Sequence, residues 1–225
     1  MISRSVAGII LAGGLSRRMG GDKFLKVLSG QPLLTHVIRR TAPQVDALAL
    51  NLNGDPKQFD HGDLPVIADT VPDYPGPLAG ILTGMEWAAG LKPRKDFILT
   101  VPCDTPFIPT DLRTRLFTAL GPENLVALAA SKEKVHAVVG LWRVDLAEAL
   151  RQAILVDGIR KVSDWTGQCR PVIVDFPVTR FDPFFNINSP ADLYLAEQEM
   201  GFSFSIGDEK ANPDSRLHFR EPVSR

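Results

Sequence analysis

An uninterrupted apolar run lies near the start of the chain at residues 6–11, with the sequence Val-Ala-Gly-Ile-Ile-Leu, and Gly13 and Gly14 follow it. Successive side chains of a strand point to opposite faces of a sheet, so a strand that is apolar at every position must be covered on both faces. Such strands are typical of parallel sheets with helices on either side. The run therefore predicts an interior first strand with a glycine-rich loop at its carboxyl end.

The segments that follow alternate between helix and strand patterns. Apolar residues recur at helical spacing in residues 31–41, 78–90 and 110–120. Short apolar runs at residues 47–52, 64–68 and 97–101 separate them and predict strands. This alternation predicts a three-layer α/β fold with a mainly parallel central sheet, whose ligands collect at the carboxyl ends of the strands.

The second half of the chain is less regular and is expected to extend the same sheet. Strands are predicted at residues 125–130, 137–142 and 171–176, and helices at 144–155, 160–165 and 190–200. Ser189, Pro190 and Asp192 fit the N-cap, first helical and capping-box positions of the last helix. The polar, aperiodic residues 201–225 predict a mobile tail after a single domain at residues 1–200.

Composition argues against several classes of protein. The chain has 225 residues, and its 25 Lys and Arg against 26 Asp and Glu leave no positive field that could hold long nucleic acid. Cys103 and Cys169 are far apart in sequence and are expected to be reduced thiols. No apolar stretch approaches the roughly 20 residues of a membrane span, and the first apolar run is too short for a signal peptide. We therefore expect a cytoplasmic protein with no membrane partner.

The loop after the first strand reads LAGGLSRRMGGDK over residues 11–23. Its glycines allow backbone N–H groups to approach anionic oxygens, and Arg18 and Lys23 add positive charge, as a triphosphate requires. The GxxxxGK[ST] spacing of a P-loop and the GxGxxG spacing of a dinucleotide-binding loop are both absent. Composition alone would also fit a surface turn, so the order of the residues has to decide.

Polar residues follow three other predicted strands. Asp104 follows one, Asn51 and Asn53 end another, and Asp69 ends a third, which places them at the same edge of the sheet as the glycine-rich loop. Mg²⁺ prefers one or two carboxylates together with phosphate oxygens and water, which suits Asp104. The two asparagines and Asp69 can recognise a base or a ribose, although Asn53 would equally serve as a turn residue.

The ordered string at residues 11–23 resembles the LxGGxSxRMGxDK signature of nucleotidyltransferases that share the fold of sugar-1-phosphate transferases. The match extends through every defining position, which decides against a surface turn. The resemblance implies a Rossmann-like nucleotidyltransferase fold, a nucleoside triphosphate substrate and Mg²⁺ as cofactor.

Three further strings narrow the resemblance. DYPGPLAG, PCDTPFIP and FNINSPADL occupy residues 73–80, 102–109 and 185–193. Together with the glycine-rich loop they resemble the molybdenum cofactor guanylyltransferase family over about residues 6–199. The resemblance implies transfer of GMP from GTP to the terminal phosphate of the molybdenum-molybdopterin cofactor, with release of pyrophosphate. A role as a transient partner of molybdoenzyme assembly proteins stays open beside catalysis, since an oxygen-sensitive product would be handed over directly.

The resemblance places GTP in the N-terminal half of the domain and the pterin substrate in the C-terminal half. The residues implied for the nucleotide are Leu11, Ala12, Gly13, Gly14, Lys23, Asn51, Asp69, Gly80 and Asp104. Arg18, Lys23 and Asp104 are implied for catalysis, Asp104 also for the metal, and Arg160, Lys161, Asn186 and Asn188 for the pterin substrate. His136 is followed by Ala137 where the family commonly has proline, and we expect His136 to be structural.

Several alternatives stay open at this point. A molybdopterin cytidylyltransferase or a sugar-1-phosphate nucleotidyltransferase would keep the chemistry and change the substrates. A non-catalytic nucleotide-binding regulator would bind the triphosphate without turning it over. Cys103 adjoins Asp104, but no histidine is placed in sequence to activate it as a nucleophile, so we expect a small buried residue.

Overall fold

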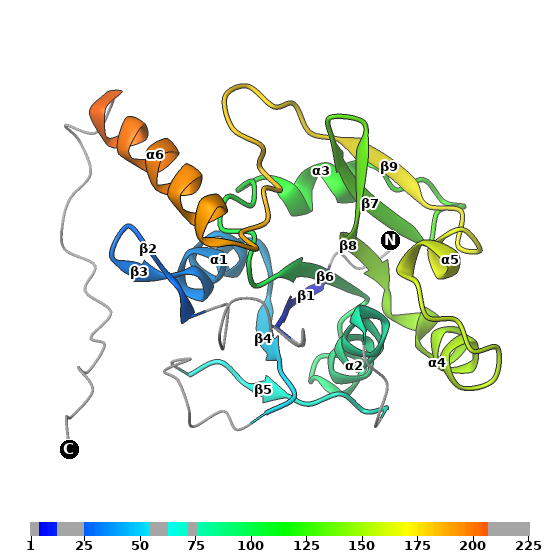
Figure 1. Ribbon diagram of the computed structural model, residues 1–225. Coiled ribbons are helices and arrows are strands. Elements are labelled where there is room, and N and C mark those ends of the chain that lie inside the picture. Colours follow the sequence, from blue (N-terminus) through cyan, green and yellow to red (C-terminus); the bar gives the residue numbers. More distant parts are fainter. Residues whose placement is uncertain (1–4, 13–24, 55–62, 72–75, 207–225) are drawn as a thin grey trace, which may run out of the picture.

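The computed structural model describes residues 5–12, 25–54, 63–71 and 76–206 (Figure 1). The strands of the central sheet are β1 (Val6–Leu11), β4 (Ala47–Asn51), β5 (Val66–Ile67), β6 (Phe97–Pro102), β7 (Val126–Ser131), β8 (Lys134–Arg143) and β9 (Val172–Asp175). The helices are α1 (Leu33–Thr41), α2 (Pro77–Gly90), α3 (Leu112–Ala119), α4 (Ala147–Leu155), α5 (Val162–Thr166) and α6 (Pro190–Ile206). Two short strands, β2 (Val27–Leu28) and β3 (Gln31–Pro32), pair separately, and 3₁₀ turns η3 (Ala42–Gln44) and η5 (Val144–Leu146) join longer elements.

The seven strands of the central sheet lie in the order β5-β4-β1-β6-β8-β7-β9. Strand β1 is parallel to both β4 and β6, with Leu11 opposite Asn51 on one side and Pro102 on the other. Strand β8 is antiparallel to β6 and β7. Lys132 and Glu133 join β7 to β8 with φ of 48° and 61°, the positive values of a tight type I′ hairpin, which forces the antiparallel direction. The predicted α/β fold with a mainly parallel sheet is therefore confirmed.

Helices cover both faces of the sheet (Figure 1). Ala7 and Ile9 of β1 pack into a core with α2, α4 and α5, and we call this side the α2 face. Val6 and Ile10 point the other way, into a core with α1 and α3, and we call this side the α1 face. The strict alternation along β1 explains why its sequence is apolar at every position.

The structure corrects several predicted boundaries. Residues 31–32 belong to β3 and not to a helix, because Pro32 is the N-cap of α1 and the helix begins only at Leu33. Residues 144–146 form the turn η5 before α4, and α5 begins at Val162. Helix α6 continues past the predicted end near residue 200 to Ile206, into the segment assigned to the tail.

The predicted start of α6 is confirmed in atomic detail. The Ser189 hydroxyl accepts a hydrogen bond from the Asp192 backbone N–H at 3.2 Å, and the Asp192 carboxylate accepts one from the Ser189 N–H at 2.8 Å. This reciprocal pair is a capping box. Ile187 and Ala196 pack against Leu28 of β2 and Leu33 of α1, which fixes α6 on the α1 side of the molecule. Within the described segments, no helix combines the length and apolarity needed to cross a bilayer.

Candidate active site

The carboxyl ends of β1, β4 and β6 form one continuous edge, which we call the carboxyl edge. Backbone pairing continues just beyond these strands. The Ala12 N–H donates to the carbonyl of Asn51 at 2.9 Å, and the Cys103 N–H donates to the carbonyl of Leu11 at 3.0 Å. The structure therefore brings the predicted residues Leu11, Ala12 and Asn51 together with Asp104, which follows Cys103.

Asn51, Asn53 and Asp69 form a hydrogen-bonded cluster at the carboxyl edge. The Asn51 side-chain amide donates to Asp69 Oδ1 at 2.8 Å, and the Asn53 amide donates to Asp69 Oδ2 at 2.5 Å. The Asp69 backbone N–H donates in return to Asn53 Oδ1 at 2.7 Å. Both oxygens of the Asp69 carboxylate are thus fixed in orientation, and each retains a lone pair for another donor.

Gly80 of α2 lies directly behind this cluster. A Cβ atom at this position would overlap Asn51 Oδ1 and would stand 2.8 Å from Cδ2 of Leu11, closer than van der Waals contact allows. Only glycine lets the first turns of α2 approach β1 and β4 this closely. The packing of α2 therefore fixes the position of the buried Asn51 side chain.

A hydrogen bond to α2, which the sequence did not predict, holds the segment after Asp69 in place. The Thr70 backbone N–H donates to the Thr83 hydroxyl of α2 at 2.9 Å, and Thr83 is buried. Thr83 lies thirteen residues from Thr70 within an apolar helix pattern, so no local sequence motif predicts the contact.

Asp104 follows β6 at the carboxyl edge and is half-buried. Its backbone carbonyl accepts a hydrogen bond from the Ile187 N–H at 3.0 Å, and the Thr105 hydroxyl lies 3.4 Å from its Oδ1. In the described part of the chain, no three His, Cys, Asp or Glu side chains gather where they could hold a metal ion. Mg²⁺ in nucleotide sites takes one or two carboxylates together with substrate phosphate oxygens and water, and Asp104 could supply one such carboxylate.

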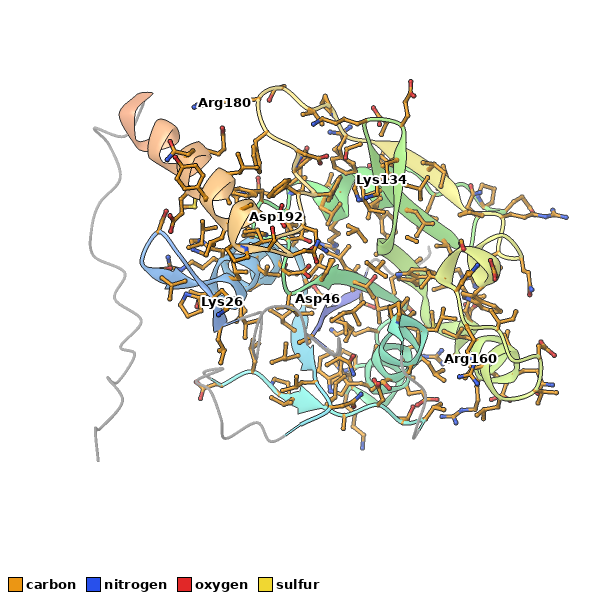
Figure 2. All side chains as sticks on the ribbon, in the orientation of Figure 1. Lys26, Asp46, Lys134, Arg160, Arg180 and Asp192 are labelled. Atoms are coloured by element: carbon orange, nitrogen blue, oxygen red, sulfur yellow. The ribbon has the colours of Figure 1, made fainter. Side chains whose placement is uncertain are left out.

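The residues predicted for a second substrate fall into two groups that the structure does not bring together. Asn186 and Asn188 flank Ile187, which contacts Asp104. Arg160 and Lys161 lie in the connection between α4 and α5, which belongs to the α2 face. Figure 2 shows Arg160 beside α4, well away from Asp192 at the start of α6. Charge and sequence order alone could not show that the two groups belong to different layers.

Four predicted residues, Gly13, Gly14, Arg18 and Lys23, lie outside the described residues. The described neighbours of this segment are Ala12 before it and Leu25 after it. Both pack on the core of the α1 face. The carboxyl edge therefore reaches the start of the glycine-rich loop at Ala12.

The fold and the carboxyl edge fit the predicted class of protein, a nucleotidyltransferase, and the family assignment shows this class. A family model described as the MobA-like NTP transferase domain matches residues 8–170. The chain belongs to this family.

Individual relatives agree with the family assignment. Two proteins named molybdenum cofactor guanylyltransferase come from Rhodopseudomonas palustris (strain BisB5) and Nitrobacter hamburgensis. The first is 50% identical over 192 residues, covering 84% of this chain and 91% of the relative. The second is 46% identical over 193 residues, covering 85% of this chain and 92% of the relative.

Solved structures agree with the fold. Molybdopterin-guanine dinucleotide biosynthesis protein A from Archaeoglobus fulgidus superposes with a TM-score of 0.68 at 24% identity, covering 87% of this chain and 99% of the other. Rv0371c from Mycobacterium tuberculosis, in a complex with manganese, superposes with a TM-score of 0.60 at 17% identity, covering 86% and 98%. At these identities the likeness shows the shared fold.

Proposed function

We propose that the chain transfers GMP from GTP to the terminal phosphate of the molybdenum-molybdopterin cofactor and releases pyrophosphate. The observation that carries the proposal is a carboxyl edge with Asn51, Asp69 and Asp104, in a chain that spans about nine-tenths of relatives named molybdenum cofactor guanylyltransferase. GTP and the pterin would then meet at this edge.

The Asp69 cluster supports guanine as the base. Guanine presents two adjacent donors, N1–H and the N2 amino group, and a carboxylate accepts two such hydrogen bonds. Asn51 and Asn53 hold the Asp69 carboxylate in place before any nucleotide arrives. Cytosine lacks this pair of adjacent donors, so the same carboxylate would bind CTP less well.

Replacing Gly80 by alanine tests whether the close packing of α2 against Asn51 is needed to position the hydrogen-bonded cluster. The new Cβ would displace Asn51, so we expect the free energy of unfolding to fall by about 1–3 kcal/mol. We also expect the KM for GTP to rise. Chemical denaturation and steady-state kinetics measure the two effects. Gly90→Ala, in the same helix with open space around the new Cβ, is the matched control; it should leave the KM for GTP unchanged and should not lower the stability. A Gly80→Ala variant with wild-type stability and KM would contradict this account.

The chemistry needs positioning and charge neutralisation more than proton transfer. The attacking group is a phosphate oxygen, which is already anionic, and it displaces pyrophosphate in line from the α-phosphorus of GTP. A general base is therefore unnecessary. Arg18 and Lys23 are proposed to neutralise the departing pyrophosphate. Asp104 would hold a divalent cation, proposed to be Mg²⁺, which neutralises charge on the triphosphate when bound.

Replacing Cys103 tests the alternative mechanism, in which the thiol forms a covalent intermediate. Its side chain is 7% exposed and packs in the core of the α1 face, away from a nucleophile's usual position. We expect Cys103→Ala to keep at least about half of the wild-type turnover, because the nucleophile belongs to the substrate. Turnover with GTP and molybdopterin measures this. Complete loss in a variant that still folds would establish a covalent role for the thiol.

Pyrophosphate release separates the candidate functions. Each of GTP, CTP, ATP and UTP is supplied with Mg²⁺ and molybdopterin, and then with a sugar 1-phosphate in place of molybdopterin. We expect release with GTP and molybdopterin at least about a hundredfold faster than with any other pair. Faster release with CTP would make the chain a cytidylyltransferase. Binding of GTP without release under any condition would make it a regulator.

A further inference from the structure

Three side chains from separate elements form a hydrogen-bonded chain that the proposed chemistry has not used. Ser131 ends β7, His136 lies near the start of β8, and Asp182 lies between β9 and α6. The fully buried Ser131 hydroxyl donates to Asp182 Oδ1 at 2.8 Å, and His136 Nε2 lies 2.7 Å from the same hydroxyl oxygen. The Phe184 backbone N–H also donates to Asp182 Oδ1, at 2.9 Å, which fixes the carboxylate.

The order of these hydrogen bonds fixes the tautomer of His136. The hydroxyl hydrogen of Ser131 is directed to Asp182, so the hydroxyl oxygen must accept the Nε2–H of His136. Burial lowers the pKa of His136, an effect that Asp182 opposes and Lys134 reinforces. The imidazole is therefore neutral at neutral pH and carries its proton on Nε2. Nδ1 is left as a hydrogen-bond acceptor, and the described residues provide no donor for it.

This arrangement is not the triad of a hydrolase. In a nucleophilic triad the histidine accepts the serine proton and a carboxylate orients the histidine. Here the serine stands in the middle and gives its proton to the carboxylate. Ser131 is also fully buried, so no substrate carbonyl can reach it.

His136 lies at the same end of the sheet as Asp104. Gly140 of β8 is opposite Thr100 of β6 in an antiparallel pair, so residues before Gly140 lie alongside those after Thr100. The His136 ring packs against Phe184, with ring centroids 4.7 Å apart. Three residues further along, the Ile187 N–H bonds to the Asp104 carbonyl. One short segment, residues 184–188, therefore contacts both His136 and Asp104.

The same segment carries the two amides assigned to the acceptor substrate. Asn188 and Asn186 are linked to each other, with the Asn188 side-chain amide 3.4 Å from the Asn186 carbonyl. Figure 2 shows Lys134 at the β7–β8 hairpin and Asp192 at the start of α6, with the segment that joins β9 to α6 between them. A molecule bound along residues 184–188 would therefore lie on a segment that contacts both His136 and Asp104.

We propose that Nδ1 of His136 binds the acceptor substrate by accepting a hydrogen bond from an N–H group of its heterocycle, beside Asn186 and Asn188. The inference rests on the proposed function and specifies the acceptor side of the same site. A reduced pterin carries several ring and amino N–H donors, which match a neutral imidazole with a fixed lone pair. His136 thus takes the role in acceptor recognition that the sequence did not assign to it.

His136→Phe tests the proposal with the least disturbance. Phenylalanine keeps the ring packing against Phe184 and removes Nδ1 together with the Nε2–H donor to Ser131, and the Ser131→Ala variant controls for loss of the second contact. We expect the KM for molybdopterin to rise about tenfold, the value of one hydrogen bond, with an unchanged KM for GTP and nearly unchanged kcat. His136→Asn, which restores a short acceptor, should recover part of the affinity. Ser131→Ala should have a smaller effect of about threefold, because it frees the tautomer but keeps the ring.

Two results would overturn the proposal. One is a His136→Phe variant with wild-type KM for molybdopterin. The other is an equal rise in the KM for GTP and for molybdopterin, which would mark a general disturbance. If His136→Phe fails to fold by thermal melting, the same criteria apply to His136→Asn. Guanylyl transfer by the wild-type chain is measured first, so that its absence, which would refute the proposed function, is distinct from a failure at His136.

Discussion

Replacing Asp104 by asparagine is expected to lower the rate of pyrophosphate release from GTP about a thousandfold, the cost of losing a major electrostatic contact at the reacting phosphate. Asparagine keeps the shape of the side chain and removes the charge that would hold a divalent cation. The fold should survive, because Asp104 is half-buried and contacts Ile187 through its backbone carbonyl. Single-turnover kinetics at saturating GTP and Mg²⁺ measure the rate, and circular dichroism melting measures the stability.

Asp111→Asn provides the matched control for this substitution. Asp111 is an exposed carboxylate before α3 whose side chain makes no capping hydrogen bond to that helix. The control should retain the wild-type rate, since it removes the same charge at a distance from the carboxyl edge. A rate for Asp104→Asn within about twofold of wild type, less than the effect of a single hydrogen bond, would exclude Asp104 from catalysis.

Replacing Lys23 by alanine is expected to reduce kcat by a similar factor, about a thousandfold. The expectation comes from the position of Lys23 in the signature at residues 11–23, because we propose that Lys23 supplies charge to the departing pyrophosphate. The lost interaction strengthens as the leaving group gains charge, so kcat should fall more than the affinity for GTP. Steady-state kinetics and GTP binding by calorimetry separate the two quantities.

Lys26→Ala is the control for Lys23. Lys26 lies three residues further along, outside the signature, and its backbone carbonyl accepts a hydrogen bond from Leu33 that the substitution leaves intact. Loss of turnover in Lys23→Ala alone would place that lysine at the leaving group. Normal turnover in Lys23→Ala would remove it from the site.

The sequence predicted the strands of the central sheet that are buried on both faces, because such strands are apolar at almost every position. Strands β1 and β6 are long and apolar at almost every position, because helices cover them on both sides. The β2–β3 hairpin was missed because each strand has only two residues, too few to show a period. The start of β8 was missed because Lys134 and Val135 are exposed there.

The sequence predicted which residues lie at the candidate site, but it did not predict the hydrogen bonds that they make there. Asn51 and Asp69 could be placed on one edge because both end strands of a parallel sheet. Their direct hydrogen bond joins residues eighteen positions apart, and no pattern encodes it. Arg160 and Lys161 were grouped with Asn186 on charge and order, although they belong to another layer. The chain from Asp182 through Ser131 to His136 depends on three separate elements meeting, which only the folded molecule shows.

The central claim is that the carboxyl edge binds a nucleotide together with a divalent cation held by Asp104. Mn²⁺ binding followed by electron paramagnetic resonance, with and without GTP, tests this most directly in the wild type and in Asp104→Asn. We predict that GTP strengthens Mn²⁺ binding in the wild type, and that Asp104→Asn weakens binding in the presence of GTP at least about tenfold, a loss of roughly 1.4 kcal/mol. Equal Mn²⁺ affinity in the two proteins with GTP bound would contradict the account.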